Sequence, residues 1–116
     1  MVEDDEIIRH ATAQVLAADD FVVAEAADVL QAMSILGARD DIAVVFTDVD
    51  LPGRVDGAAL AQMLVSQAPW ISVVVTSSTR PLGKIGFAFL AKPYRADVML
   101  RLIRRAADQA RRSQDS

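Results

Sequence analysis

Short runs of β-branched and aromatic residues alternate with longer amphipathic stretches along this chain of 116 residues. The runs cover 21–24, 42–47, 71–76 and 87–91, and two of them are continuously apolar. Continuously apolar strands are typical of a parallel sheet that is buried on both faces. The alternation therefore predicts an α/β fold in which helices cover both faces of a parallel sheet.

Four stretches between and after these runs keep helical spacing, and we expect helices at 7–16, 29–36, 60–64 and 94–111. Gly37 is expected to stop the second helix, and Asp56-Gly57 to begin the third. Residues 77–86 contain Pro81, Gly83 and Gly86, which predicts a loop with at most one helical turn. A fifth strand is implied before Asp4, either very short or beginning outside the sequence.

The composition predicts one compact domain over 1–116, with a frayed tail at 110–116. The lack of cysteine excludes a thiol nucleophile and a cysteine-ligated zinc site, and it favours the reducing cytoplasm. A net charge of −4 has the wrong sign for binding nucleic acid. No apolar run reaches the ~20 residues of a membrane span, and the acidic start is unlike a signal peptide. We therefore expect neither nucleic acid nor membrane as a partner.

Polar residues stand where the expected strands end. Glu3 and Asp4 end the first, Asp48 the third, Thr76 the fourth, and Lys92 the fifth. In a parallel α/β sheet, ligands bind beyond these carboxyl ends. Clustered carboxylates favour Mg²⁺, and a lysine and a hydroxyl can hold phosphoryl oxygens. The set predicts phosphoryl transfer to Asp48.

These residues carry a resemblance that covers essentially the whole chain. The chain resembles the receiver domain of two-component response regulators. The matching motifs are Val2-Glu3-Asp4-Asp5, residues 44–53 followed by Asp56-Gly57, residues 73–77, and Lys92-Pro93-Tyr94.

The resemblance implies a flavodoxin-like, doubly wound sheet of five parallel strands in the order 2-1-3-4-5, with a cis Lys92-Pro93 peptide. It also implies phosphorylation of Asp48 by a sensor histidine kinase or a histidine phosphotransfer protein. Mg²⁺ would be held by Asp4 and Asp48, by Glu3 through water, and by the backbone carbonyl of Asp50. Lys92 and Thr76 would assist the transfer.

The same resemblance implies an output. Thr76 and Phe89 would form the switch that passes the signal to a downstream protein. The sequence leaves open which protein this is and whether the chain forms a homodimer. The chain is several residues short between Thr76 and Lys92, so we expect the fourth helix to be shortened or absent. Asp50 occupies a position that varies widely in the family, so the lifetime of the phosphorylated state is not carried over.

Other readings stay open. Each residue alone has a structural explanation: Asp4 or Asp5 could cap the first helix, and Asp48 could begin a turn. A haloacid-dehalogenase-like phosphatase would use Asp48 as nucleophile and Asp50 as acid and base. A receiver-like interaction module would take no phosphate. With no output domain after the last helix, a free-standing regulator and a receiver cut from a hybrid kinase or a longer regulator are both compatible with the sequence. In the receiver reading the domain is not a substrate-turnover enzyme.

Overall fold

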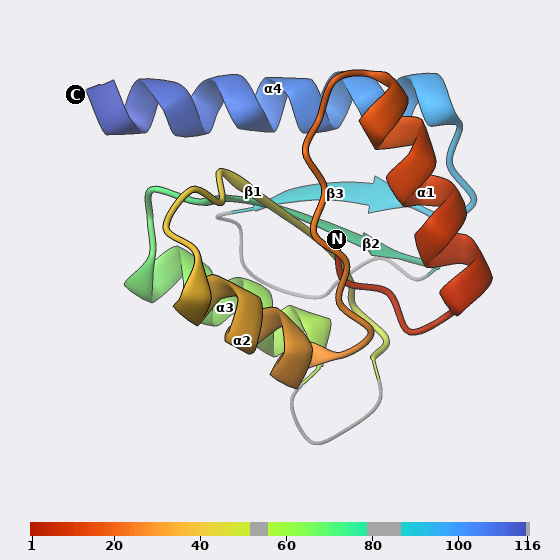
Figure 1. Cartoon of the computed structure of the whole chain (residues 1–116), viewed down its shortest axis with the longest axis horizontal. Helices are drawn as coiled ribbons and strands as arrows, with labels where there is room; N and C mark the ends of the chain where they lie inside the picture. Colours follow the sequence, from red (N-terminus) through yellow and green to blue (C-terminus); the bar gives the residue numbers. More distant parts are fainter. Residues whose placement is uncertain (52–55, 79–86, 116) are drawn as a thin grey trace.

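The protein forms a three-layer α/β/α structure (Figure 1). The structure is a computed structural model, and it describes residues 1–51, 56–78 and 87–115. The described elements are, in chain order, α1 (Glu6–Ala18), α2 (Val29–Ala38), β1 (Val44–Asp48), α3 (Gly57–Gln67), β2 (Ser72–Ser77), β3 (Ala88–Ala91) and α4 (Ala96–Asp115).

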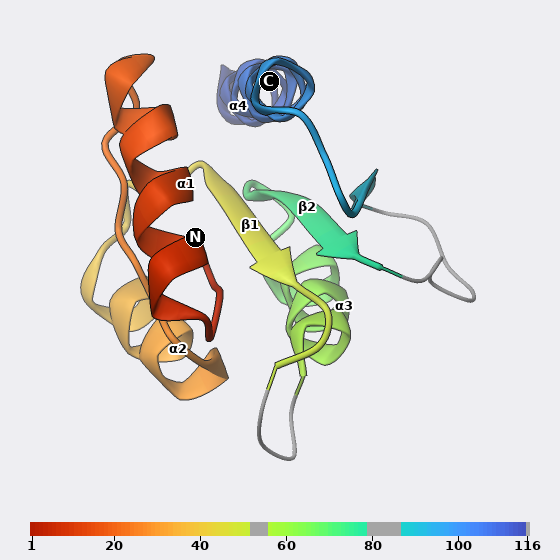
Figure 2. The same ribbon diagram turned by 90° about the vertical axis from the view of Figure 1, so that its right-hand side faces the viewer.

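The three strands are parallel and lie in the order β1-β2-β3. Asp48 of β1 is the partner of Thr76 of β2, and Thr76 is in turn the partner of Leu90 of β3. Their carboxyl ends therefore lie at one edge of the sheet. Figure 2 shows α4 on one side of the sheet and α3 on the other, with α1 and α2 beyond β1.

Each face of the sheet has its own hydrophobic core, because neighbouring side chains of a strand point to opposite faces. Val45 belongs to the core against α2 and α3, in which Leu60 is fully buried. Phe46 belongs to the core against α1 and α4, in which Met99 has only 1% of its surface exposed. Burial on both sides explains why these strands read as continuously apolar runs.

The expected strand at 21–24 is wrong, because these residues form no strand. Val2 makes single parallel bridges to Ala26 on one side and to Thr47 on the other. The ladder ends there, and an apolar cavity of about 290 Å³ lies between the 21–26 segment and β1. Residues 21–24 thus lack an adjacent strand that could satisfy their backbone groups. The bridges place Val2 between Ala26 and Thr47, as the expected order requires, but the described residues form three strands, so the five-stranded sheet is not confirmed.

Three expected helix limits were also wrong. Gly37 does not stop α2, which continues to Ala38 before Arg39 takes an extended conformation. The last helix begins at Ala96 rather than near Tyr94 and runs to Asp115 rather than Arg111. Tyr94 packs against Phe46 instead, with the two ring centres 5.9 Å apart in an edge-to-face arrangement.

The loop expected at 77–86 begins later than predicted, because Ser77 still belongs to β2. Residues 79–86 of that loop, and with them the fourth helix of the resemblance, lie outside the described residues. The cis peptide bond between Lys92 and Pro93 is confirmed. In the described part of the chain, no helix has both the length and the apolar character needed to span a bilayer.

Candidate functional site

The site lies at the carboxyl edge of the sheet and is built from three chain segments. Asp48 ends β1, and Glu3 follows the bridging Val2 beside it. Lys92 follows β3, and its amide donates to the carbonyl of Ser77 at the end of β2. The parallel arrangement therefore brings residues from both ends of the sequence to one place.

Lys92 joins the two buried carboxylates of the site. Its Nζ lies 2.5 Å from Oδ2 of Asp48 and 3.7 Å from Oε1 of Glu3. The Asp48 and Glu3 side chains are each only 5% exposed, whereas that of Lys92 is 30% exposed. The ammonium thus partly neutralises two carboxylates that water reaches poorly.

Three carboxylates are close enough to share one cation. One carboxylate oxygen each from Glu3, Asp4 and Asp48 lies within 4.8 Å of the other two. Asp4 is exposed, so the cluster opens to solvent on its side. Three carboxylates facing one ammonium leave a surplus of negative charge, and an all-oxygen donor set suits a hard divalent ion. The residues fit Mg²⁺ on these grounds.

The ionisation of the site follows from burial and from its neighbours. Burial raises the pKa of Glu3, and the nearby Asp4 and Asp48 raise it further against the opposing effect of Lys92. Burial alone would lower the pKa of Lys92, but the hydrogen bond and charge of Asp48, together with Glu3, outweigh it and raise this pKa. Lys92 is therefore held in its charged form.

Thr76 supplies a hydroxyl beside Asp48 on the neighbouring strand. Its Oγ1 is buried, and among the buried side-chain nitrogen and oxygen atoms of the described residues it is the one without a hydrogen-bond partner. A buried hydroxyl without a partner is costly unless something else uses it. Thr76 is thus an available donor at the site.

The remaining expected site residues are placed as follows. Asp50 is exposed, and its backbone amide donates to Oδ1 of Asp48 at 3.0 Å, so it helps to orient the acceptor. Phe89 is partly buried and packs against the core on the α2 and α3 face. Asp5 caps the first helix, as the structural alternative predicted: its carboxylate accepts a hydrogen bond from the amide of Ile8 at the start of α1.

Gly57 lies against the site, although the sequence indicated for it only a helix start and a place in the matching motif. A Cβ atom at Gly57 would lie 1.8 Å from the carbonyl oxygen of Asp48. Only glycine permits this approach of α3 to the end of β1. The signal was the glycine directly after Asp56, which caps α3 by accepting from the amide of Ala59.

The fold and the site together define an α/β domain with a carboxylate and lysine cluster at the carboxyl edge of its sheet, and comparison with known proteins identifies its family. Residues 1–104 match the family model described as the response regulator receiver domain, and the chain belongs to this family. It is the receiver domain of a two-component response regulator, which favours the receiver reading over the phosphatase-like alternative.

Among its relatives is the C4-dicarboxylate transport transcriptional regulatory protein DctD of Rhizobium meliloti (strain 1021), 27% identical over 118 residues. This match covers 96% of the chain but only 25% of the relative. The receiver domain of NtrX from Brucella abortus is 29% identical, with a TM-score of 0.78 over 92% of this chain and 95% of that one. The receiver domain of the hybrid histidine kinase CckA is 27% identical, with a TM-score of 0.78 over 91% and 94%.

Proposed function

We propose that this receiver accepts a phosphoryl group on Asp48 in a Mg²⁺-dependent reaction and works as a phosphorylation-dependent switch. The observation that carries the proposal is the pairing of Asp48 with Lys92 inside a cluster of three carboxylates. Asp48 is held by both of its oxygens, one by Lys92 and the other by the amide of Asp50. A nucleophile fixed in this way needs little further positioning.

In the transfer, an Asp48 oxygen attacks the phosphorus of a phosphohistidine. The new P–O bond forms as the P–N bond breaks, and the released imidazole takes a proton from water. Mg²⁺ bound by Asp4 and Asp48, with Glu3 acting through water and the Asp50 carbonyl as a further ligand, would neutralise charge on the phosphoryl oxygens. Lys92 neutralises another oxygen, and the free hydroxyl of Thr76 donates to a third.

The donor in this proposal is a sensor histidine kinase or a histidine phosphotransfer protein, and the reaction takes place in the cytoplasm. The downstream partner is a protein that distinguishes the two states of the domain, with Thr76 and Phe89 as the switch pair. A water molecule ends the signal by hydrolysing the acyl phosphate, so the domain turns over its own phosphoryl group and no other substrate.

Intact-mass measurement after treatment with acetyl phosphate tests the assignment. We expect one added phosphoryl group in the wild type, and none in Asp48→Asn or in the presence of EDTA. Asp50→Asn is the matched control, because it removes the neighbouring carboxylate without touching the acceptor. Labelling that persists in Asp48→Asn would refute the proposal, and sustained hydrolysis of phosphomonoesters that depends on Asp50 would favour a phosphatase.

A further inference from the structure

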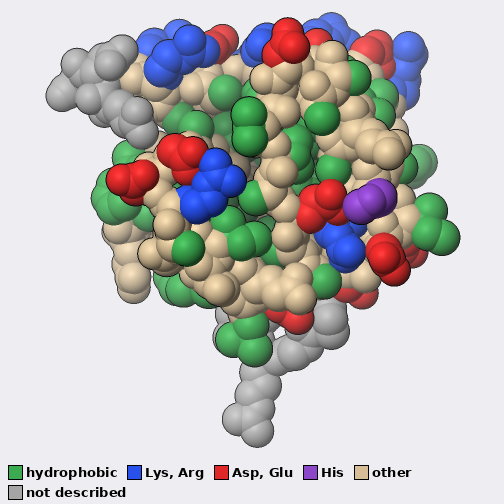
Figure 3. Space-filling model, in the orientation of Figure 1, with side chains coloured by type: hydrophobic (Ala, Val, Ile, Leu, Met, Phe, Trp, Pro, Cys, Tyr) green, Lys and Arg blue, Asp and Glu red, His purple; other side chains and the backbone are tan. Residues whose placement is uncertain are grey.

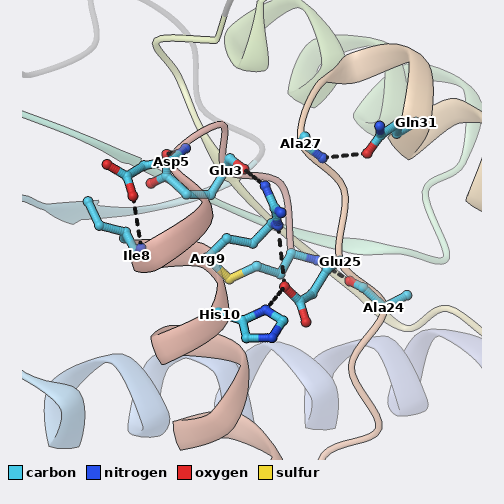
Figure 4. A network of polar contacts seen from close by, with 10 residues as sticks. Glu3, Asp5, Ile8, Arg9, His10, Ala24, Glu25, Ala27 and Gln31 are labelled. Atoms are coloured by element: carbon cyan, nitrogen blue, oxygen red, sulfur yellow. Dashed lines mark hydrogen bonds and ion pairs between the residues drawn. The ribbon is translucent and has the colours of Figure 1, made fainter.

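A polar network behind the acidic cluster connects three segments of the chain (Figure 4). Arg9, in the first turns of α1, donates from Nε to Oε1 of Glu25 at 3.3 Å. The same guanidinium donates from Nη1 to the carbonyl oxygen of Glu3 at 3.0 Å. His10 also contacts Oε1 of Glu25, at 3.1 Å, but its side chain is 66% exposed. Arg9 is the inner member of the network, since only 16% of its side chain is exposed.

The carbonyl that Arg9 holds belongs to the peptide bond between Glu3 and Asp4. The other peptide group of Glu3 is also fixed, because its amide donates to the carbonyl of Ala26. Asp4, whose carboxylate belongs to the acidic cluster, is attached directly to the peptide group that Arg9 holds. The orientation of this peptide thus fixes the position of the Asp4 Cα atom, from which the carboxylate projects.

The charge of Arg9 alone would have the opposite effect on a cation. A guanidinium behind three carboxylates repels a divalent ion, so its removal would strengthen cation binding if charge were its whole contribution. The carboxylate of Glu25 faces the guanidinium and reduces this repulsion. Replacing Arg9 should therefore weaken cation binding if Arg9 acts by orienting the peptide, and strengthen cation binding if Arg9 acts by its charge alone.

We propose that Arg9, anchored by Glu25, is a positioning residue for the cation site. It fixes the Glu3–Asp4 peptide before the ion arrives, without contacting the ion. An arginine suits this role because its planar fork can donate to two acceptors at once, which a lysine ammonium on a flexible stem does less well. The inference rests on the proposed Mg²⁺ dependence and adds a residue outside the ligand set.

The test is Mg²⁺ titration by calorimetry on the whole chain, in Arg9→Met and Arg9→Lys. Loss of a group that orients a metal ligand lowers metal affinity by 10-fold or more, and we expect Mg²⁺ to bind about tenfold more weakly to Arg9→Met. Arg9→Lys keeps the positive charge but loses the planar guanidinium that donates to two acceptors, so this variant should also bind Mg²⁺ more weakly. Arg39→Met is the matched control: Arg39 pairs with Asp41 at the opposite end of β1, and its removal changes the net charge equally.

Amide exchange of the metal-free protein gives a second readout. The amide of Asp5 donates to Oε2 of Glu3, and we expect its exchange to become faster in both Arg9 variants and to stay unchanged in Arg39→Met. Equal or tighter Mg²⁺ binding by Arg9→Met, or wild-type affinity in Arg9→Lys, would overturn the inference alone. If Arg9→Met does not fold, Arg9→Lys decides. A wild type that binds no Mg²⁺ would overturn this inference and the proposed function together.

Discussion

Gly57→Ala should damage both the stability of the domain and its site. The added Cβ would lie 1.8 Å from the Asp48 carbonyl oxygen, whereas ordinary contact begins at 3.4 Å. The end of β1 and the start of α3 must therefore separate by about 1.6 Å, the difference between these distances. Because the obstacle is backbone, we expect a cost near the upper end for overpacking, about 3 kcal/mol, which lowers Tm by about 10 °C.

The same movement displaces Asp48 from Lys92. A misplacement of about 1 Å can reduce a reaction rate by about 10²-fold, so phosphorylation by acetyl phosphate should slow by that order even in the folded fraction. Gly37→Ala is the matched control. Among the described residues, no atom outside the adjoining residues and the helix's own backbone lies within 4 Å of a Cβ at Gly37 inside α2, and alanine there should stabilise the domain by roughly 0.5–1 kcal/mol. Thermal unfolding and phosphorylation of Gly57→Ala that match those of the wild type would refute this reasoning.

Two further predictions concern ionisation and aromatic packing. Burial and the neighbouring carboxylates raise the pKa of Glu3, so the folded state holds this proton more tightly than the unfolded chain does. Stability from this group is lost as pH rises through the raised pKa, so metal-free Glu3→Gln should gain stability over the wild type as pH rises from the ordinary glutamate value of 4.5 through that raised pKa. A difference in unfolding free energy between the two proteins that stays constant over this rise, measured in urea, would contradict this. Tyr94→Phe removes the hydroxyl that lies beside Thr12 but keeps the edge contact with Phe46. We expect the loss of this polar contact to cost about 1 kcal/mol in urea unfolding, and unfolding curves identical to those of the wild type would contradict this.

The site was predictable because its residues stand at strand ends. Asp48, Thr76 and Lys92 each follow a buried apolar run, and parallel strands carry such residues to one edge. In the described part of the chain, the three strands that form each pair with a neighbour over several residues. The local hydrophobic pattern was sufficient to predict a strand wherever a neighbouring strand provides hydrogen-bond partners for its backbone.

The errors arose where tertiary contacts decide the outcome. Residues 21–24 have the composition of a strand, but beside this segment the described chain offers only single contacts, from the Met1 amino group to the Ala24 carbonyl and from Val2 to Ala26. Arg9 and Glu25 carry no signal in the local sequence pattern, and only the contacts of Arg9 with both Glu25 and the Glu3 carbonyl distinguish them. The close approach of Gly57 to Asp48 likewise involves residues that the local pattern assigns to a separate strand and helix.

The distance along the chain between Glu3 and Lys92 has a consequence for synthesis. Glu3, Asp4 and Asp48 are translated before Lys92, which pairs with Glu3 and Asp48 in the folded chain. Lys92 reaches them only when β3 has paired with β2. A nascent chain that ends before β3 therefore lacks the ammonium at the acceptor, and a kinase meets the paired acceptor only after that strand has docked.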